Sequence, residues 1–303
     1  MSDVMKKAVI TGATGSIGHA LIEKLVAEGI DVTVLYHRES QRINMLSESE
    51  HIKRICCSLD EMKDFVPSEA DCEVFYHLAW AGTTGAARND TELQLKNIEY
   101  TLDAVELAKR MGCRKFIGAG SQAEYGLCDK PLTPDTPAFP FTGYGMAKLA
   151  AGQLSRLKCR QLGMEHSWIR ILSVYGEYDA DNSVIKTAVK KFTANEDAEF
   201  SKGEQLWDFL NAKDAANAFY LVGNDTQHNE SIYCLGSGKA APLREYIETI
   251  HKLCKSRSKT DFGAIPYSEN QVMFLQADIS ELTRDTGFKP ETSFEAGIKE
   301  LLD

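Results

Sequence analysis

The sequence has no long apolar run and fewer basic than acidic residues, and each shortage excludes a class of protein. No segment approaches the roughly 18 apolar residues of a membrane-spanning helix. The N-terminal apolar stretch is interrupted by Lys6, Lys7 and a glycine cluster, unlike a secretory signal. The 34 Lys and Arg against 44 Asp and Glu give a formal charge of −10, opposite to that of a general nucleic-acid or anionic-membrane binder. We therefore expect a cytoplasmic protein that binds neither.

Paired cysteine motifs are also absent. The eight cysteines form no C-x-x-C pair and no His-containing metal pattern. Without a secretory signal, they are predicted to be free thiols in a reducing cytosol, and no metal is expected. The 303 residues are 43% apolar and 26% charged, an ordinary globular composition. This length suffices for one large α/β domain or two smaller ones.

Short apolar runs alternate with amphipathic stretches in the first part of the chain. The pattern predicts strands at 7–11, 31–36, 73–79, 115–119 and 167–172, and helices at 19–28, 91–111 and 144–162. Repeated β-α alternation favours an α/β fold with a doubly wound parallel sheet of the Rossmann type.

After about residue 175 the alternation becomes less regular. The pattern predicts helices at 183–194, 213–222 and 242–256, and a pair of strands around 198–211. We expect residues 1–175 to form a dinucleotide-binding Rossmann domain, to which 205–225 return. Residues 176–303 should mainly form a smaller C-terminal α/β lobe that binds substrate beyond the carboxyl ends of the strands.

A glycine turn joins the first predicted strand to the first predicted helix. Gly12, Gly15 and Gly18 allow a tight turn, close approach to a pyrophosphate, and packing of the helix on the sheet. The N–H groups and positive dipole end of the helix would then face the phosphates. The turn therefore predicts dinucleotide binding.

The end of the second predicted strand bears on the choice of cofactor. An acidic residue there would hold the ribose hydroxyls of NAD, but the chain has Tyr36, His37 and Arg38, with Arg42 nearby. Arg38 could bind a 2′-phosphate bidentately. The sequence favours NADP(H) and leaves NAD(H) as the alternative.

Three polar residues form a candidate catalytic set. Tyr144 and Lys148 are four residues apart and share a face of a predicted helix. A neighbouring cation stabilises a phenolate and lowers its pKa, which makes Tyr144 a candidate proton donor and acceptor for a carbonyl–carbinol pair. Ser121 follows the predicted strand 115–119 and could hold the substrate oxygen.

Over nearly its whole length the chain resembles the extended short-chain dehydrogenase/reductases, many of which act on nucleotide sugars. The motifs that carry the resemblance are Thr11–Gly18, His77–Ala79, Asn97 in Asn-x-x-x-Thr, Ser121–Gly126, Tyr144 with Lys148, Arg170–Gly176, Trp207–Phe209 with Asp214, and Ala277–Ser280. The resemblance implies that Ser121 orients the carbonyl, that Tyr144 moves the proton, and that Lys148 holds the nicotinamide ribose and tunes Tyr144.

The resemblance also suggests which residues contact ligands. The expected cofactor contacts are Thr11, Gly12, Thr14, Gly15, Ser16, Ile17, Gly18, His37, Arg38, Leu78, Ala79, Tyr144, Lys148 and Leu172. The expected substrate contacts are Trp80, Gln122, Ser173, Asn182 and Trp207.

Several positions depart from the family pattern. Gln122 and Ala123 stand where the family's dehydratases have an Asp-Glu pair, which disfavours dehydration. Ser173 replaces a frequent asparagine, and Trp207 and Ser268 stand where nucleotide-sugar enzymes often have arginines for the diphosphate. Either Lys186, Lys190 or Lys202 substitutes for these arginines, or the substrate is different.

The favoured function is NADP(H)-dependent reduction or oxidation of a nucleotide-sugar carbonyl, of the 4-keto-6-deoxyhexose reductase type. The first alternative is an NAD-dependent nucleotide-sugar 4-epimerase, which uses the same three residues. The second is a noncatalytic dinucleotide sensor, for which a tuned phenol would have no use. The resemblance also implies a homodimer formed through the helices at 91–111 and 144–162.

Overall fold

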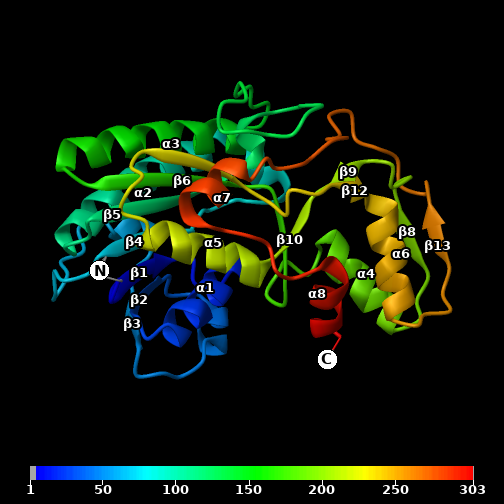
Figure 1. Cartoon of the computed structure of the whole chain (residues 1–303), viewed down its shortest axis with the longest axis horizontal. Helices are drawn as coiled ribbons and strands as arrows, with labels where there is room; N and C mark the ends of the chain where they lie inside the picture. The colour runs from blue at the N-terminus through cyan, green and yellow to red at the C-terminus, as the bar shows by residue number, and fades with distance from the viewer. Residues whose placement is uncertain (1–4, 303) are drawn as a thin grey trace.

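A seven-stranded parallel sheet is the larger part of the structure, a computed structural model that describes residues 5–302 (Figure 1). Its strands are β1 (Lys7–Thr11), β2 (Asp31–Tyr36), β3 (Ile52–Cys56), β4 (Val74–His77), β5 (Lys115–Ser121), β6 (Glu165–Ile171) and β11 (Ser231–Leu235). Their spatial order is β11-β6-β5-β4-β1-β2-β3, and every neighbouring pair is parallel. The predicted doubly wound α/β fold is therefore confirmed.

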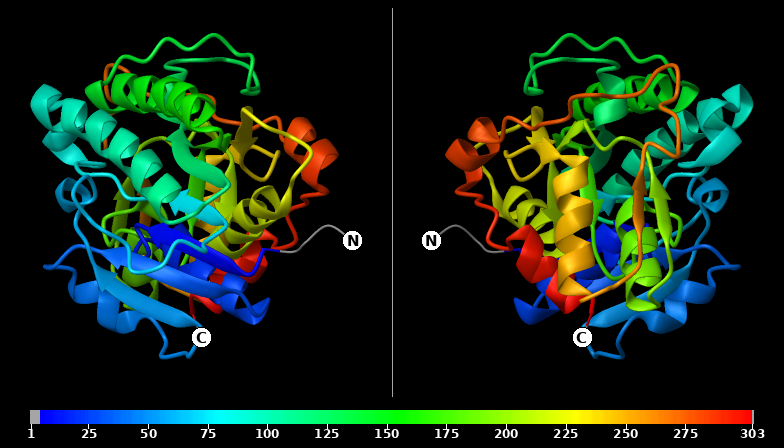
Figure 2. Two further views of the ribbon diagram at one scale, coloured as in Figure 1. Left: turned by 90° about the vertical axis from the view of Figure 1, so that its left-hand side faces the viewer. Right: turned by 90° about the vertical axis from the view of Figure 1, so that its right-hand side faces the viewer.

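Two helix pairs cover the two faces of this sheet. Helices α1 (Ser16–Ala27) and α5 (Ala212–Asn224) pack against strand residues such as Ile10. Helices α2 (Thr91–Arg110) and α3 (Gly143–Leu162) pack against the other face, which includes Val9, and they lie side by side (Figure 2). Because consecutive strand residues point to opposite faces, a strand buried on both sides is apolar at nearly every position. Continuous burial from Ala8 to Thr11 shows this in β1.

The chain returns to the large sheet after an excursion. Strand β6 ends at Ile171, yet its outer neighbour β11 begins only at Ser231. The sequence predicted neither β11 nor β3 at the opposite edge. Strand β11 pairs with β6 in one unbroken register, from Ser231 opposite Ser167 to Leu235 opposite Ile171.

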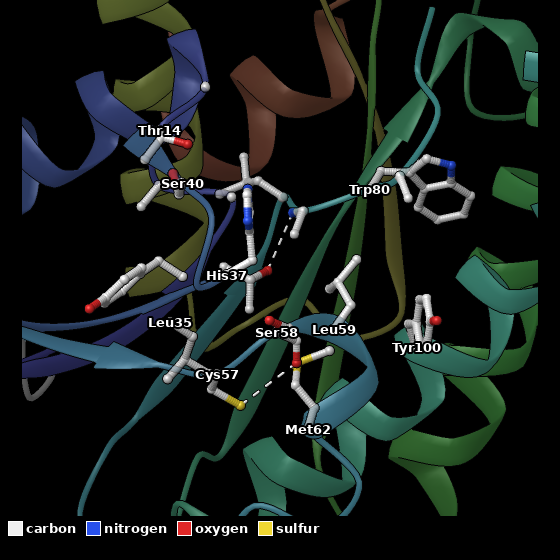
Figure 3. A pocket seen from close by; sticks show the side chains of 18 of the residues that line it. Thr14, Leu35, His37, Ser40, Cys57, Ser58, Leu59, Met62, Trp80 and Tyr100 are labelled. Carbon is white, nitrogen blue, oxygen red and sulfur yellow. Dashed lines mark hydrogen bonds between the residues drawn. The ribbon is translucent and has the colours of Figure 1, made fainter. Parts of the chain in front are cut away.

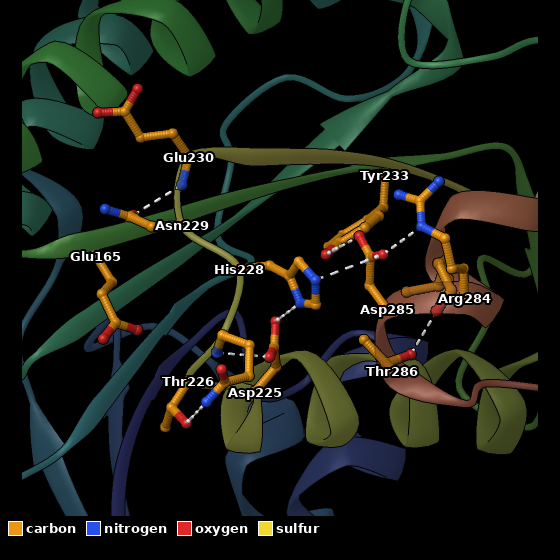
Figure 4. Close-up of polar contacts among 12 residues, drawn as sticks. Glu165, Asp225, Thr226, His228, Asn229, Glu230, Tyr233, Arg284, Asp285 and Thr286 are labelled. Carbon is orange, nitrogen blue, oxygen red and sulfur yellow. Dashed lines mark hydrogen bonds and ion pairs between the residues drawn. The ribbon is translucent and has the colours of Figure 1, made fainter.

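A polar cluster fixes the turn between α5 and β11 (Figure 4). His228 lies between two carboxylates, with Nδ1 3.1 Å from Asp225 Oδ2 and Nε2 3.6 Å from Asp285 Oδ1. The Tyr233 hydroxyl and Arg284 Nε donate to Asp285 at 3.1 Å and 2.7 Å. The cluster thereby joins the turn, strand β11 and helix α7 (Ser280–Thr286).

The smaller lobe is built from helices α4 (Val184–Thr193), α6 (Leu243–Leu253) and α8 (Phe294–Glu300), which gather at one end of the molecule (Figure 1). Its strands pair over long sequence distances: β8 (Ala198–Phe200) with β13 (Thr260–Phe262), β9 (Leu206–Trp207) with β12 (Ala241–Pro242), and β10 (Phe209–Asn211) with β7 (Ser173–Tyr175). The predicted pairing of two strands within 198–211 is therefore wrong, because each short strand there finds a partner elsewhere.

All eight cysteines lie within the described residues and are free thiols. Between residues 5 and 302, none of the helices has the length and apolar character needed to cross a membrane. In the same part of the chain, no group of three or more His, Cys, Asp or Glu side chains is placed to hold a metal ion.

Candidate active site

The turn between β1 and α1 requires glycine at two positions. Gly12 has φ +75°, and a Cβ there would lie 2.5 Å from the Ala79 nitrogen. A Cβ on Gly18 would lie 2.2 Å from the Gly12 oxygen. The Gly15 N–H closes the turn by donating to the Gly12 oxygen at 3.2 Å. A side chain at Gly12 or Gly18 would therefore collide with neighbouring backbone atoms, so the close approach of these backbone segments requires glycine.

The start of α1 fits a bound anion. Gly15 is the N-cap residue and has no side chain to cap the helix, and the first turn contains no acidic residue. The Ser16 hydroxyl is buried and finds no hydrogen-bond partner among the described residues. First-turn N–H groups are donors that a phosphate requires, whereas the Ser16 hydroxyl faces Gly176 in a small separate cavity. The first-turn N–H groups fit the pyrophosphate of a dinucleotide.

A cavity of about 600 Å³ extends from this turn across the carboxyl ends of the strands (Figure 3). Its walls include seven of the predicted cofactor residues, namely Thr11, Gly12, Thr14, Gly15, His37, Leu78 and Ala79. Figure 3 shows Thr14 and Trp80 on opposite sides of the cavity, with Ser58 near its floor. Its volume is within the range of cavities that enclose small molecules and cofactors.

Other predicted cofactor residues lie outside the cavity wall. The side chain of Arg38 is 80% exposed, and its Nη2 is 3.6 Å from Glu61 Oε1. Ile17 packs against the sheet core, and Leu172 packs among Tyr125, Leu132 and neighbouring apolar residues. Sequence reasoning missed Glu61, which places a negative charge beside the arginine expected to bind a 2′-phosphate.

The three predicted catalytic residues come together. Ser121 ends β5, whereas Tyr144 and Lys148 lie in the first two turns of α3. Thr142 fixes the start of that helix, since its hydroxyl accepts the Gly145 N–H at 3.1 Å. Ser121 acts to lower the pKa of the Tyr144 phenol, against the larger raising effect of burial. Trp80 meets the Tyr144 ring edge-on at 6.0 Å between ring centres, so the set borders the Trp80 end of the cavity.

The ammonium group of Lys148 is directed toward the Ala119 oxygen and the Trp80 ring rather than toward the phenol of Tyr144. Its Nζ donates to the Ala119 oxygen at 2.6 Å and lies 3.7 Å from the centre of the Trp80 ring, but 5.9 Å from that of Tyr144. Burial lowers the pKa of Lys148 to about 7. Burial also raises the pKa of Tyr144, against the opposing effects of Ser121 and Arg88. Burial, Ser121 and Arg88 are the main influences on the Tyr144 pKa in the structure, and the tuning of Tyr144 by Lys148 stays a prediction.

Buried Glu124 holds the backbone of Ser121 through a hydrogen bond. Its carboxylate accepts from the Ser121 N–H at 2.8 Å, Trp168 Nε1 at 2.9 Å and Arg170 Nε at 2.7 Å. The side chains of Glu124 and Arg170 are 1% and 4% exposed, so the ion pair is buried. Because the Glu124 carboxylate is occupied by these three bonds, we assign it a structural role. Gln122 and Ala123, which precede it, have no carboxylate. The capping pattern Ser-x-x-Glu at 121–124 could have indicated this role.

A second cavity of about 290 Å³ lies toward the smaller lobe, and its walls include Ser173, Asp179, Gln205 and Trp207. Trp207 Nε1 donates to the Ser173 hydroxyl at 2.8 Å, so two departures from the family pattern are hydrogen-bonded to each other. Asn182 is exposed on the loop before α4 and lines neither cavity.

Comparisons with known proteins agree with this fold. CDP-abequose synthase of Salmonella muenchen is 28% identical over all of this chain and 99% of its own length. The dTDP-4-dehydro-6-deoxyglucose reductase of Escherichia coli is 24% identical over 99% of this chain and 98% of its own.

Solved structures of similar shape include the UDP-glucose 4-epimerase of Thermotoga maritima with UDP-glucose, with a TM-score of 0.87 and 19% identity. RMD from Pseudomonas aeruginosa, complexed with NADPH, has a TM-score of 0.79 and 20% identity. Each alignment covers 98% of both chains.

The family comparison covers most of the chain. A model of the NAD dependent epimerase/dehydratase family matches residues 8–236, from β1 through β11. The chain therefore belongs to the NAD dependent epimerase/dehydratase family and is an NAD(P)-dependent enzyme of the short-chain dehydrogenase/reductase type.

Proposed function

We propose that this enzyme is an NADPH-dependent reductase of a nucleotide-linked 4-keto-6-deoxyhexose. The observation that carries the choice is the end of β2, where Tyr36, His37 and Arg38 replace the acidic residue that would favour NAD. The synthase and reductase named above support the substrate class, because their names refer to nucleotide-linked sugars.

The three catalytic residues have separate tasks in this reaction. Bound NADPH supplies a hydride to the carbonyl carbon. The Ser121 hydroxyl, held by the capping bonds of Glu124, donates a hydrogen bond to the carbonyl oxygen. Tyr144 gives its phenolic proton to that oxygen. Lys148, whose ammonium donates to the Ala119 oxygen at 2.6 Å, would hold the nicotinamide ribose.

The two parts of the chain divide the binding. Residues 1–175, to which 205–225 return, form the dinucleotide-binding domain, although its Ser173 and Trp207 face the substrate, and 176–303 mainly form the substrate-binding lobe. Trp207 and Ser173 form a wall of the second cavity, which we assign to the nucleotide sugar. Exposed Leu95, Leu154 and Leu157 on α2 and α3 support a homodimer through these helices, which light scattering would detect.

NADPH is expected to bind more tightly than NADH, and Arg38→Asp should weaken NADPH binding on the order of tenfold to a hundredfold. The substitution removes a bidentate partner of the 2′-phosphate and adds repulsion. Glu61→Gln should strengthen NADPH binding instead, because Glu61 lies 3.6 Å from Arg38. Fluorescence titrations with both cofactors measure these affinities.

Lys53→Asp is the matched control for Arg38→Asp. Lys53 lies on neighbouring β3 and is paired with exposed Glu69, and the same charge change there should leave the ratio of the two affinities unchanged. Equal or tighter binding of NADH by the unaltered protein would contradict the cofactor assignment.

The reductase and the 4-epimerase differ in what happens to the cofactor. A reductase should consume NADPH stoichiometrically with a keto sugar linked to cytidine, thymidine, uridine or guanosine diphosphate. Absorbance of NADPH and analysis of the product sugar measure this. Purified protein that holds NAD tightly and interconverts UDP-glucose and UDP-galactose without added cofactor would overturn the reductase. Tight NADPH binding with neither reaction would favour the dinucleotide sensor.

A further inference from the structure

The segment Gly82–Asn89 is anchored beside the catalytic residues by two helices. From α2, the Gln94 amide nitrogen donates to the Gly82 oxygen at 3.1 Å and to the Ala87 oxygen at 2.9 Å. At the start of α3, the Gly143 N–H donates to Asn89 Oδ1 at 3.0 Å. These bonds hold the short helix Gly85–Asn89 against the residue that precedes Tyr144.

Arg88 extends from this segment over the ring of Tyr144. Its guanidinium carbon lies 4.3 Å from the ring centre, and Nη1 donates to the Thr83 oxygen at 2.9 Å. Arginine stays charged at all working pH values, and a cation over an aromatic face is attracted more strongly once that ring becomes a phenolate. The geometry thus provides a permanent positive charge at the phenol.

The other charged groups that face Tyr144 contribute less. Lys148 is more distant, at 5.9 Å from the ring centre, and its ammonium is directed to the Ala119 oxygen and the Trp80 face. Glu124 is negative but forms a buried pair with Arg170. Of these groups, Arg88 is the one whose positive charge acts on Tyr144 without a stronger partner.

We propose that Arg88 is a positioning residue of the active site, whose guanidinium stabilises the negative charge that Tyr144 acquires when it gives up its proton. The inference rests on the proposed role of Tyr144. The phenolic O–H bond breaks, its electron pair stays on the tyrosine oxygen, and the proton goes to the carbonyl oxygen as hydride from NADPH reaches the carbon.

The kinetic test compares Arg88→Gln, Arg88→Lys and the unaltered enzyme, with the keto-sugar nucleotide that proves active. Arg88→Gln should lower kcat on the order of tenfold at neutral pH and leave KM unchanged. Its high-pH loss of reductase activity should move to higher pH, because the phenol holds its proton longer. Arg88→Lys should restore much of kcat. A rise in KM with an unchanged pH profile would overturn the proposal and make Arg88 a substrate ligand.

Arg156→Gln is the matched control, because Arg156 lies on the same helix as Tyr144 but pairs with exposed Gln153. This variant should keep both kcat and the pH profile. A shift equal to that of Arg88→Gln would mean that any loss of positive charge near α3 is sufficient, and would overturn the proposal.

A second measurement needs no substrate. Protein labelled with ¹³C at the tyrosine ζ carbon shows the ionisation of each phenol by NMR, and the Tyr144 signal is the one missing from Tyr144→Phe. The titration midpoint of the Tyr144 signal should move to higher pH in Arg88→Gln, and in Arg88→Lys it should lie close to that of the unaltered protein. An unchanged titration would overturn the proposal. A clear shift in protein that reduces no keto sugar would retain the role of Arg88 and reject the proposed reductase.

Discussion

Tyr144→Phe is expected to reduce turnover about 100-fold or more, because it keeps the ring and removes the proton that is given to the carbonyl oxygen. Binding of NADPH should barely change, since the phenol oxygen does not belong to the wall of the 600 Å³ cavity. Steady-state oxidation of NADPH and a fluorescence titration of the cofactor measure the two effects separately.

Tyr220→Phe provides the matched control for this loss. Tyr220 lies on α5, where its hydroxyl contacts Glu28 at 3.3 Å, far along the chain from the catalytic set. Tyr220→Phe, which also removes one phenolic hydroxyl, should leave turnover unchanged. If Tyr144→Phe retained most of its activity, the proton would have to come from another group.

Glu124→Ala is expected to lower the free energy of unfolding by about 3–5 kcal/mol, because it leaves the Arg170 guanidinium buried without its carboxylate. It also removes the acceptors of Trp168 Nε1 and the Ser121 N–H. Urea unfolding followed by circular dichroism measures the loss. Activity should fall below that expected from stability alone, since Ser121 loses the bond that holds its backbone.

Glu69→Ala tests whether burial is the cause. Glu69 pairs with Lys53 at 3.0 Å, but the two side chains are 59% and 50% exposed. Water screens such a pair, so its removal should change stability far less. Comparable losses in the two variants would contradict the assignment of a buried network to Glu124.

The sequence was sufficient for elements whose apolar spacing is regular. Strands β1 and β2 were predicted with the bounds that the structure shows, and α2 ends one residue before its predicted end. The grouping of Ser121, Tyr144 and Lys148 could be predicted because two of them share one helix and the third ends a strand. The glycine turn could be predicted because its spacing reflects backbone constraints that are local.

Contacts between distant or polar segments could not be predicted in the same way. Strand β3 is short and contains Lys53 and Arg54, so it lacks an apolar signal. The buried face of α2 includes Gln94 and Asn97, which are polar because they bond the loop after β4. Arg88 reaches Tyr144 through a turn of the chain that periodicity does not describe.

The late return of the chain to the large sheet has a consequence for its biosynthesis. Strands β1 to β6 are complete at Ile171, but the helix α5 that covers their Ile10 and Ile169 face is synthesised only at 212–224. The Met5 N–H bonds Asn224 Oδ1 at 3.0 Å, across 219 residues of chain. A nascent chain that ends before α5 therefore exposes an apolar sheet face and requires protection from aggregation. The large sheet is completed only after α5 and β11 have been synthesised. A chain cut after residue 211 would therefore not fold as a smaller, self-sufficient cofactor-binding protein.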